Sequence, residues 1–173
     1  LEEGLMKADI PYVIYSGAQF FDRMEIKDAL CYLRMIACRD DMAFRRIVNK
    51  PKRNIGRRRM DFLTEKAQEE NTSLYETLKK YVEDPLFKKT KAGDFIDLIE
   101  YFTKDSEGKQ VSEVLSAILD ESGYEKMLRT EGSQERLDDL AELKQSIFEY
   151  ESTAGEETSI SDYLDHAALF SNM

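Results

Sequence analysis

The sequence predicts an all-α fold, and three observations lead to this prediction. Charged residues make up 35% of the 173 positions, while Gly and Pro occur only 8 and 3 times, a composition that favours long surface helices over a β-sandwich. Apolar residues make up 42%, with 9 Phe and 9 Tyr, which is enough for a packed core. From residue 40 onward, apolar residues recur at helical spacing nearly throughout. We therefore expect an irregular helical domain that contains a helix-turn-helix-like basic hairpin, plus one short extended segment near the N-terminus.

The first part of the chain contains the expected extended segment and then a helix. Residues 10–15, Ile-Pro-Tyr-Val-Ile-Tyr, form a β-type run that ends at Ser16-Gly17. Asp22 can then cap a helix, with Glu25 three positions later in a capping-box arrangement. Apolar residues at i, i+3, i+4 and i+7 continue this helix to about Cys38.

Further helices are predicted from their start signals and apolar stripes. Asp40 and Asp41 can cap the first helix of the basic hairpin. The later predicted helices are residues 73–81, opened by Ser73 with Glu76; residues 87–102; residues 113–121, preceded by Val111 and Ser112 and closed by Gly123; residues 134–152; and residues 159–170.

The basic hairpin, residues 42–60, is the feature on which the functional prediction depends. From Ala43 to Met60 it has eight basic residues and no acidic one. The whole chain has a net charge of −10, so the rest of the sequence carries −18. Positive charge concentrated on one short element is typical of phosphate contact. The alternative interpretation is a solvated face whose arginines pair with the acidic remainder.

The turn of the hairpin adds geometry to this charge. Pro51 should end the first helix near Asn49. Gly56 allows backbone to approach a ligand closely. A second helix that begins at Arg57 would direct its unpaired N–H groups and its dipole toward the turn, which makes an anion site. We expect Lys52, Arg53 and Arg57 at the tip. We expect Arg45, Arg46 and Arg58 to be better placed for longer-range steering.

Several other classes of function are disfavoured by the sequence. Cys31 and Cys38 would be ~10 Å apart along one helix, beyond the ~7 Å Cα separation that a disulfide allows, so we expect reduced thiols and a cytoplasmic protein. A single His and the lack of Cys-x-x-Cys argue against a metal site. No run of ~18 apolar residues is present. No Gly-x-x-x-x-Gly-Lys-[Ser/Thr] loop occurs, so we expect no catalytic residue and no bound cofactor.

Five segments of the sequence carry a resemblance to a known family. The first two are Ile10-Pro-Tyr-Val-Ile-Tyr-Ser-Gly and Phe20-Phe-Asp-Arg-Met-Glu-Ile-Lys-Asp-Ala-Leu-Cys-Tyr-Leu-Arg34. The third is Asp40-Asp-Met-Ala-Phe-Arg-Arg-Ile-Val-Asn-Lys-Pro-Lys-Arg-Asn-Ile-Gly56. Ser122-Gly-Tyr and Arg136-Leu-Asp-Asp-Leu140 come next. In this order they resemble UvrD/PcrA/Rep-type superfamily-one DNA helicases over almost the whole chain, and the first two segments together are similar to helicase motif IVa.

The resemblance implies a domain organisation. Residues 1–39 would be the C-terminal edge of the first part of the second RecA-like domain (2A). Residues 40–173 would be the helical accessory domain (2B) inserted in it. The sequence would then be part of a longer helicase, whose ATP and Mg²⁺ are bound elsewhere in the parent chain.

The resemblance also implies where DNA is contacted. The duplex-contacting residues would be Lys52, Arg53, Asn54, Ile55, Gly56, Arg57 and Arg58. The family's turn usually reads Gly-Ile-Gly, and Asn54 replaces its first Gly, although Asn tolerates left-handed backbone. The single-strand contact would fall on Phe21, as an aromatic for base stacking, and on Arg23, as a cation for a phosphate.

The functional prediction is a DNA-binding accessory domain of an ATP-dependent DNA helicase, with no catalysis of its own. Its partners would be duplex DNA, the single-strand junction and the remaining domains of the parent helicase, with no membrane contact. The alternative is a helical protein-interaction or autoregulatory module, in which acidic helices such as residues 134–152 dock a basic partner. A steep salt dependence of duplex binding would separate the two.

Overall fold

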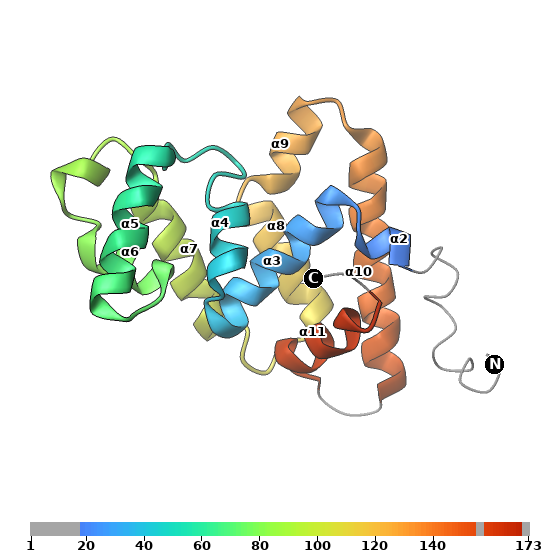
Figure 1. Ribbon diagram of the computed structural model, residues 1–173. Coiled ribbons are helices and arrows are strands. Elements are labelled where there is room, and N and C mark those ends of the chain that lie inside the picture. Colours follow the sequence, from blue (N-terminus) through green and yellow to red (C-terminus); the bar gives the residue numbers. More distant parts are fainter. Residues whose placement is uncertain (1–17, 155–157, 171–173) are drawn as a thin grey trace.

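The computed structural model describes residues 18–154 and 158–170, and every regular element in these ranges is a helix (Figure 1). In chain order the elements are α2 (Ala18–Phe21), α3 (Met24–Cys38), α4 (Asp41–Ile47), α5 (Arg57–Glu70), α6 (Leu74–Tyr81), the 3-10 turn η1 (Pro85–Phe87), α7 (Ala92–Asp105), α8 (Val111–Glu121), α9 (Tyr124–Thr130), α10 (Gln134–Ala154) and α11 (Ile160–Ala168). The predicted all-α fold is therefore confirmed. The predicted extended run, residues 10–15, lies outside the described residues.

Helix α3 is the centre of the fold. It packs against α4, α7, α8, α10 and α11. Its buried residues include Ile26, Leu30, Tyr32 and Met35, which lie on different sides of the helix, as is typical of a helix enclosed by others. The helices on both sides of residue 39 thus share one core. The domain boundary after residue 39 falls at the left-handed C-cap of α3, Arg39 with φ 58°, and its assignment stays a prediction.

Helices before and after α7 lie on different sides of α3 (Figure 1), and the two groups differ in charge. We call residues 42–91, with α4, α5, α6 and η1, the basic end, and residues 111–170, with α8 to α11, the acidic end. The basic end contains 14 Lys and Arg against 7 Asp and Glu, whereas the acidic end contains 4 against 15. Charge is therefore segregated along the chain.

Three of the predicted helix starts are formed by local caps. The Asp40 carboxylate accepts a hydrogen bond from the Ala43 N–H at 2.9 Å, and the Ser73 hydroxyl accepts one from the Glu76 N–H at 3.1 Å. At the start of α11, Ser159 and Asp162 form a complete capping box.

Two other predicted N-caps are wrong, although both helices begin within two residues of the predicted positions. The N-cap of α3 is Arg23, with no side-chain cap. The capping box of Asp22 and Glu25 does not form there because Glu25 is buried against α10 instead. At α8 the Ser112 hydroxyl is not the cap. The Glu151 carboxylate from α10 accepts the N–H groups of Val111 and Ser112, the latter at 3.2 Å.

Both cysteines lie on α3, where Cys31 is buried, Cys38 is exposed and each is a free thiol. Burial raises the pKa of the Cys31 thiol to about 11, which keeps it protonated and unreactive at neutral pH. Within the described ranges, no helix has both the length and the apolar composition that crossing a bilayer requires.

Candidate nucleic-acid interface

The turn between α4 and α5 has the boundaries that the sequence predicts. Helix α4 ends at Ile47, with Val48 as its C-cap, and α5 begins at Arg57. The Asn49 side chain holds the intervening loop together. Its Oδ1 accepts hydrogen bonds from the N–H groups of Arg53 at 3.2 Å and Ile55 at 3.0 Å.

Asn54 and Gly56 shape the outer part of the turn. Asn54 adopts the left-handed conformation, with φ 64°, which Asn tolerates better than most residues. Gly56 is the N-cap of α5 with φ −79°, a conformation open to any residue. A Cβ added there would meet nothing within 4 Å. The fold itself therefore does not require Gly at position 56, and the missing side chain leaves the start of α5 open.

Three cations of the turn face solvent. Lys52, Arg57 and Arg58 are exposed, and none of them forms an ion pair with a described residue. Their charge is therefore not neutralised locally. Arg57 and Arg58 lie in the first turn of α5, and Lys52 precedes this helix. The N-terminal N–H groups of α5 have no side-chain cap, because the N-cap residue is Gly56. The helix dipole therefore adds to the positive potential.

A second basic segment, which sequence reasoning missed, lies beside this turn. The Lys91 N–H donates to the Arg53 carbonyl at 3.0 Å, and the Asn54 amide donates to the Lys89 carbonyl at 3.4 Å. Arg59 Nε also donates to the Leu86 carbonyl at 2.6 Å. The only sequence signal was the Lys88-Lys-Thr-Lys91 cluster itself.

Together the two segments make one surface, which we call the two-loop basic surface. It consists of the exposed residues Lys52, Arg57, Arg58, Lys88, Lys89 and Lys91. Beside it lies a hollow of about 600 Å³, lined by Asn49, Lys52, Asn54, Ile55, Gly56, Arg59 and Lys89. No acidic residue lines this hollow, so it suits an anionic ligand such as a phosphate.

The expectation that Arg53 lies at the exposed tip is wrong. Only 5% of Arg53 is exposed, and its guanidinium donates to the carbonyls of Ile47 at 3.0 Å and Val48 at 2.9 Å. It also donates to the Tyr32 hydroxyl at 2.8 Å. The reason is that the last carbonyls of α4 have no partner within the helix, and a buried guanidinium donates to them.

Other residues of the predicted site also face inward. Ile55 is fully buried in the core. Arg46 pairs with the buried Asp28 carboxylate at 2.7 Å, and Lys50 pairs with the same carboxylate at 3.3 Å. Arg45 remains exposed and donates to the Thr64 hydroxyl at 2.9 Å. Of the eight cations in the hairpin, Arg46, Lys50 and Arg53 therefore serve the fold.

The predicted single-strand contacts lie elsewhere, beside α10 and α11 (Figure 1). Phe21 is 4% exposed, and its ring stacks with that of Phe170 at a centroid distance of 6.2 Å. Arg23 donates to the Asp139 carboxylate at 2.9 Å and lies over the ring of Phe20. The structure does not bring this pair together with the turn.

The carboxyl groups of Glu25 and Asp139 form a pair next to Arg23. Glu25 is buried, and this burial, together with a hydrogen bond to Asp139, raises the pKa of the Glu25 carboxyl to about 7. Arg136, at 3.7 Å from Glu25, opposes the shift. Near neutral pH, Glu25 can therefore hold a proton that it shares with Asp139.

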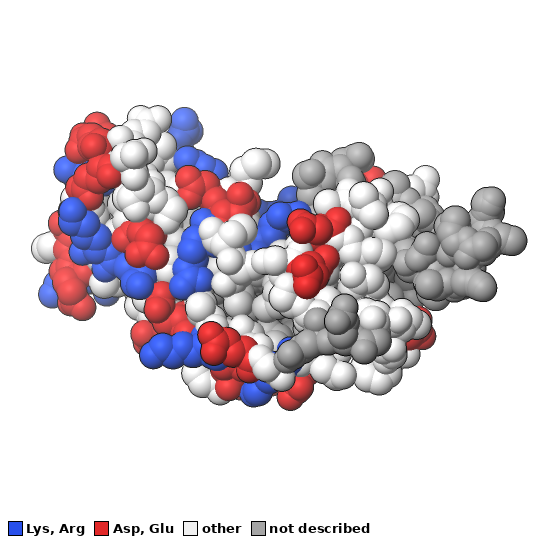
Figure 2. Space-filling model, turned by 90° about the horizontal axis from the view of Figure 1, so that it is seen from below, with Lys and Arg blue, Asp and Glu red and all other residues white. Residues whose placement is uncertain are grey.

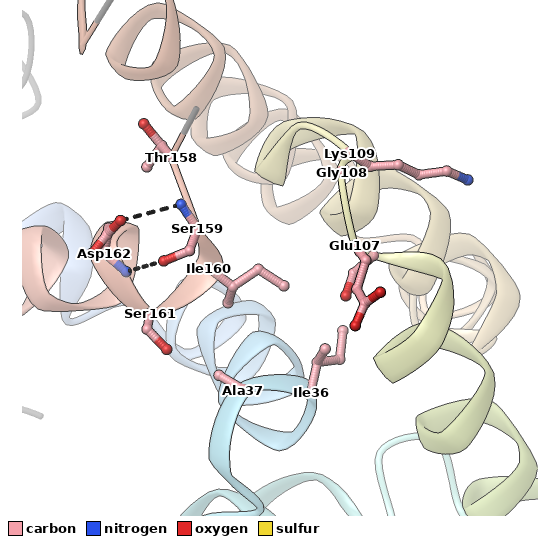
Figure 3. Close-up of a pocket in the computed structure, with 11 residues that line it drawn as sticks. Ile36, Ala37, Glu107, Gly108, Lys109, Thr158, Ser159, Ile160, Ser161 and Asp162 are labelled. Carbon is pink, nitrogen blue, oxygen red and sulfur yellow. Dashed lines mark hydrogen bonds between the residues drawn. The ribbon is translucent and has the colours of Figure 1, made fainter. Parts of the chain in front are cut away.

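A separate cavity of about 400 Å³ lies between the end of α3, the α7–α8 loop and the start of α11. Figure 3 shows the Ile36 and Ile160 side chains lining it, and the Lys109 side chain directed away from it. The start of α11 is already satisfied by the Ser159–Asp162 capping box. The lining cation Lys109 is paired with Asp105 at 2.7 Å. This cavity therefore differs from the two-loop basic surface, where the start of α5 has no side-chain cap and the cations have no ion pair with a described residue.

The face seen from below has a different charge pattern. The turn between α4 and α5 runs along the upper side in Figure 1, and Figure 2 views the molecule from the opposite side. There, basic and acidic side chains alternate over short distances. In the part of the chain that the structure describes, no group of three or more His, Cys, Asp or Glu is arranged to hold a metal ion.

Comparison with known proteins defines the class to which this helical domain belongs. Residues 1–173 match the family described as UvrD-like helicase C-terminal domain, and the chain belongs to that family. Its relatives include the ATP-dependent DNA helicase PcrA of Staphylococcus epidermidis, 37% identical over 180 residues, which covers 100% of this chain and 25% of the relative. The ATP-dependent DNA helicase PcrA of Staphylococcus aureus is 34% identical over the same share of each chain. The chain thus spans about a quarter of the length of these relatives.

Proposed function

We propose that this chain is the duplex-contacting accessory part of an ATP-dependent DNA helicase, and that it binds DNA phosphates through the two-loop basic surface. In this proposal residues 40–173 correspond to the 2B domain, and residues 1–39 to the adjoining edge of 2A. ATP, Mg²⁺ and the unwinding activity belong to the rest of the parent protein. The family membership and the named activity of the PcrA relatives support this assignment.

One observation carries the proposal: six exposed cations come from two segments that are hydrogen-bonded to each other beside the open start of α5. Lys52, Arg57 and Arg58 come from the turn, and Lys88 to Lys91 from the neighbouring loop. A duplex presents closely spaced phosphates, and each one neutralised releases counterions. Contacts of this kind fix the position of the protein without reading sequence. We therefore expect little sequence preference.

A substitution at Gly56 tests this proposal, because a side chain there should not weaken the fold but should weaken phosphate binding. Ser is a better N-cap than Gly, so Gly56→Ser should leave the stability unchanged or slightly higher. The new hydroxyl would occupy the N–H groups of α5 and fill the open space, so we expect duplex affinity to fall about fivefold, the equivalent of one hydrogen bond.

The control is Gly93→Ala, which also changes a Gly with open space around it near the start of a helix. Its duplex affinity should match the wild type, as measured by fluorescence anisotropy with thermal unfolding in parallel. If Gly56→Ser binds duplex as tightly as the wild type, the start of α5 is not a phosphate site.

The alternative function, a protein-interaction module, is supported by the acidic end. Exposed acidic residues there include Glu113, Asp120, Glu121, Glu135 and Asp138. Such a surface suits a basic partner. The single-strand contact at Phe21 and Arg23 stays a separate prediction, since it requires Arg23 to exchange Asp139 for a phosphate.

A further inference from the structure

We infer that the phosphate-binding turn is held in shape from behind, by a buried polar network in which Asp28, Tyr32, Arg53 and Tyr124 act as positioning residues. This inference rests on the proposed duplex contact and goes beyond it. None of these four residues is exposed enough to reach a ligand itself, because their exposed fractions are 0%, 0%, 5% and 0%.

Arg53 is the centre of this network. Besides the carbonyls of Ile47 and Val48, its guanidinium contacts the Ser122 carbonyl at 3.5 Å and lies over the Phe95 ring at 4.8 Å. One side chain thus joins the end of α4, α7 and the end of α8. Only the planar fork of Arg can serve partners in several directions at once, and Lys cannot replace it.

Tyr32 connects Arg53 to the backbone of Lys50, just before Pro51. Its hydroxyl accepts a hydrogen bond from Arg53 at 2.8 Å and donates one to the Lys50 carbonyl at 2.7 Å. Burial raises the pKa of the Tyr32 hydroxyl, so it remains a donor at any ordinary pH. The segment before Pro51 is therefore tied to α3.

Asp28 supplies the negative charge of the network. Its carboxylate accepts hydrogen bonds from Arg46 at 2.7 Å and from the Tyr124 hydroxyl at 2.6 Å, and it also contacts Lys50. Burial, with the neighbouring Asp28 carboxylate, raises the pKa of Tyr124. One carboxylate thus balances the two inward cations that flank the turn.

The α8–α9 junction forms the last support. Gly123 adopts a left-handed conformation with φ 85°, and a Cβ there would lie 3.3 Å from Cγ of Pro51. Its neighbours Ser122 and Tyr124 contact Arg53 and Asp28. The turn therefore rests against a segment about 70 residues further along the chain.

A surface held in this way is preorganised. Lys52 and Arg57 do not have to order the backbone between them when they meet a duplex, so less entropy is lost on binding. Weakening the network should therefore reduce affinity even though no phosphate-contacting group is removed.

Tyr32→Phe and Tyr124→Phe test this directly, because each removes one buried hydroxyl and changes no charge. The matched control is Tyr75→Phe. The Tyr75 side chain is equally buried, and its hydroxyl donates to the Glu100 carboxylate at 2.8 Å, away from the turn. All three should lose similar stability. At a temperature where each protein is fully folded, the first two should bind duplex about fivefold more weakly, and the control like the wild type.

A second pair of variants keeps the test decisive if either Phe variant fails to fold. Arg53→Lys and Arg57→Lys both preserve charge. A phosphate contact survives this exchange, whereas the contacts of Arg53 do not. We expect Arg57→Lys to stay within about twofold of the wild type, and Arg53→Lys to weaken binding by about tenfold, the loss of 1.4 kcal/mol.

The outcomes separate the two proposals. The first possible outcome is that replacing Lys52, Arg57 and Arg58 together by Ala lowers duplex affinity, whereas the variants of the buried network bind duplex like Tyr75→Phe. These network variants are Tyr32→Phe, Tyr124→Phe and Arg53→Lys. In that case the positioning role is wrong and the proposed function stands. If the triple variant binds like the wild type, the proposed function is wrong and the positioning role falls with it.

Discussion

The turn at residues 48–58 and the segment Phe21–Arg23 contain similar side chains but expose them very differently. Both were predicted from sequence to contact DNA. In the turn, Lys52, Arg57 and Arg58 are exposed, without ion pairs to described residues. In the other segment, Phe21 is buried and Arg23 is held by Asp139. Residue type gives a side chain its chemistry, but partners distant in sequence decide whether this chemistry is available to a ligand.

The largest expected effect is on the free energy of unfolding, when the carboxylate that pairs with the cations of each region is replaced by an amide. Asp28→Asn should destabilise the protein by about 3 kcal/mol, because it leaves Arg46 and Lys50 without their buried counter-charge. Asp139→Asn should cost less than about 1 kcal/mol, since Arg23 is 41% exposed and can be solvated. Urea unfolding at pH 7 measures both. Equal losses would mean that the two carboxylates support the fold alike.

The next effect is on the pH dependence of stability, and it belongs to the Phe21–Arg23 region. The pKa of Glu25 is raised to about 7 in the folded protein, above its unfolded value of about 4.3. Between these values the folded state binds more protons, so this group stabilises the protein fully below pH 4.3 and its contribution is lost as the pH rises through 7.

Glu25→Gln should remove this contribution, because its side chain stays neutral. The difference in urea midpoint between pH 5.5 and pH 8 should therefore be smaller in the variant than in the wild type. Asp120→Asn, at an exposed position, is the control and should keep the wild-type difference. An unchanged pH profile in Glu25→Gln would show that Glu25 is ionised throughout this range.

The smallest expected effect is that of Arg23 on duplex binding. Arg23→Ala should leave duplex affinity within about twofold of the wild type, because its charge is already paired with Asp139. Arg57→Ala removes an unpaired cation and should lower duplex affinity by more. Anisotropy measurements on one duplex compare them. If Arg23→Ala weakens duplex binding as much as Arg57→Ala, the distinction between the two regions is wrong.

The sequence predicted those features of the fold that depend on near neighbours. The start of α5 at Arg57 follows from Gly56, and the predicted caps at Asp40 and Ser73 join residues three positions apart. These signals lie within one helical turn, so the pattern alone contains them.

The remaining features depend on contacts between distant segments, which no local pattern contains. The burial of Arg53 needs Tyr32 and Ser122, and Ser122 is 69 residues away. The start of α8 is capped by Glu151, which lies 39 residues beyond Ser112. The approach of Lys89 to Asn54 spans 35 residues. In each case the partner is determined by tertiary packing and not by residues nearby in the sequence.

The central claim is that the turn binds duplex phosphates, and the salt dependence of binding tests it most directly. The comparison is between the wild type, the triple variant Lys52, Arg57 and Arg58 to Ala, and a control triple variant Lys104, Lys126 and Arg129 to Ala. The control positions are exposed and lie on α7 and α9. Both variants remove the same charge, so they share any long-range effect.

For three to five neutralised phosphates, the wild-type slope of log K against log salt should be about −3 to −4.5. The turn variant should flatten this slope by about three units, one for each lost contact, while the control keeps it. If all three folded proteins give the same slope, the turn is only a solvated face, and the protein-interaction function replaces duplex binding.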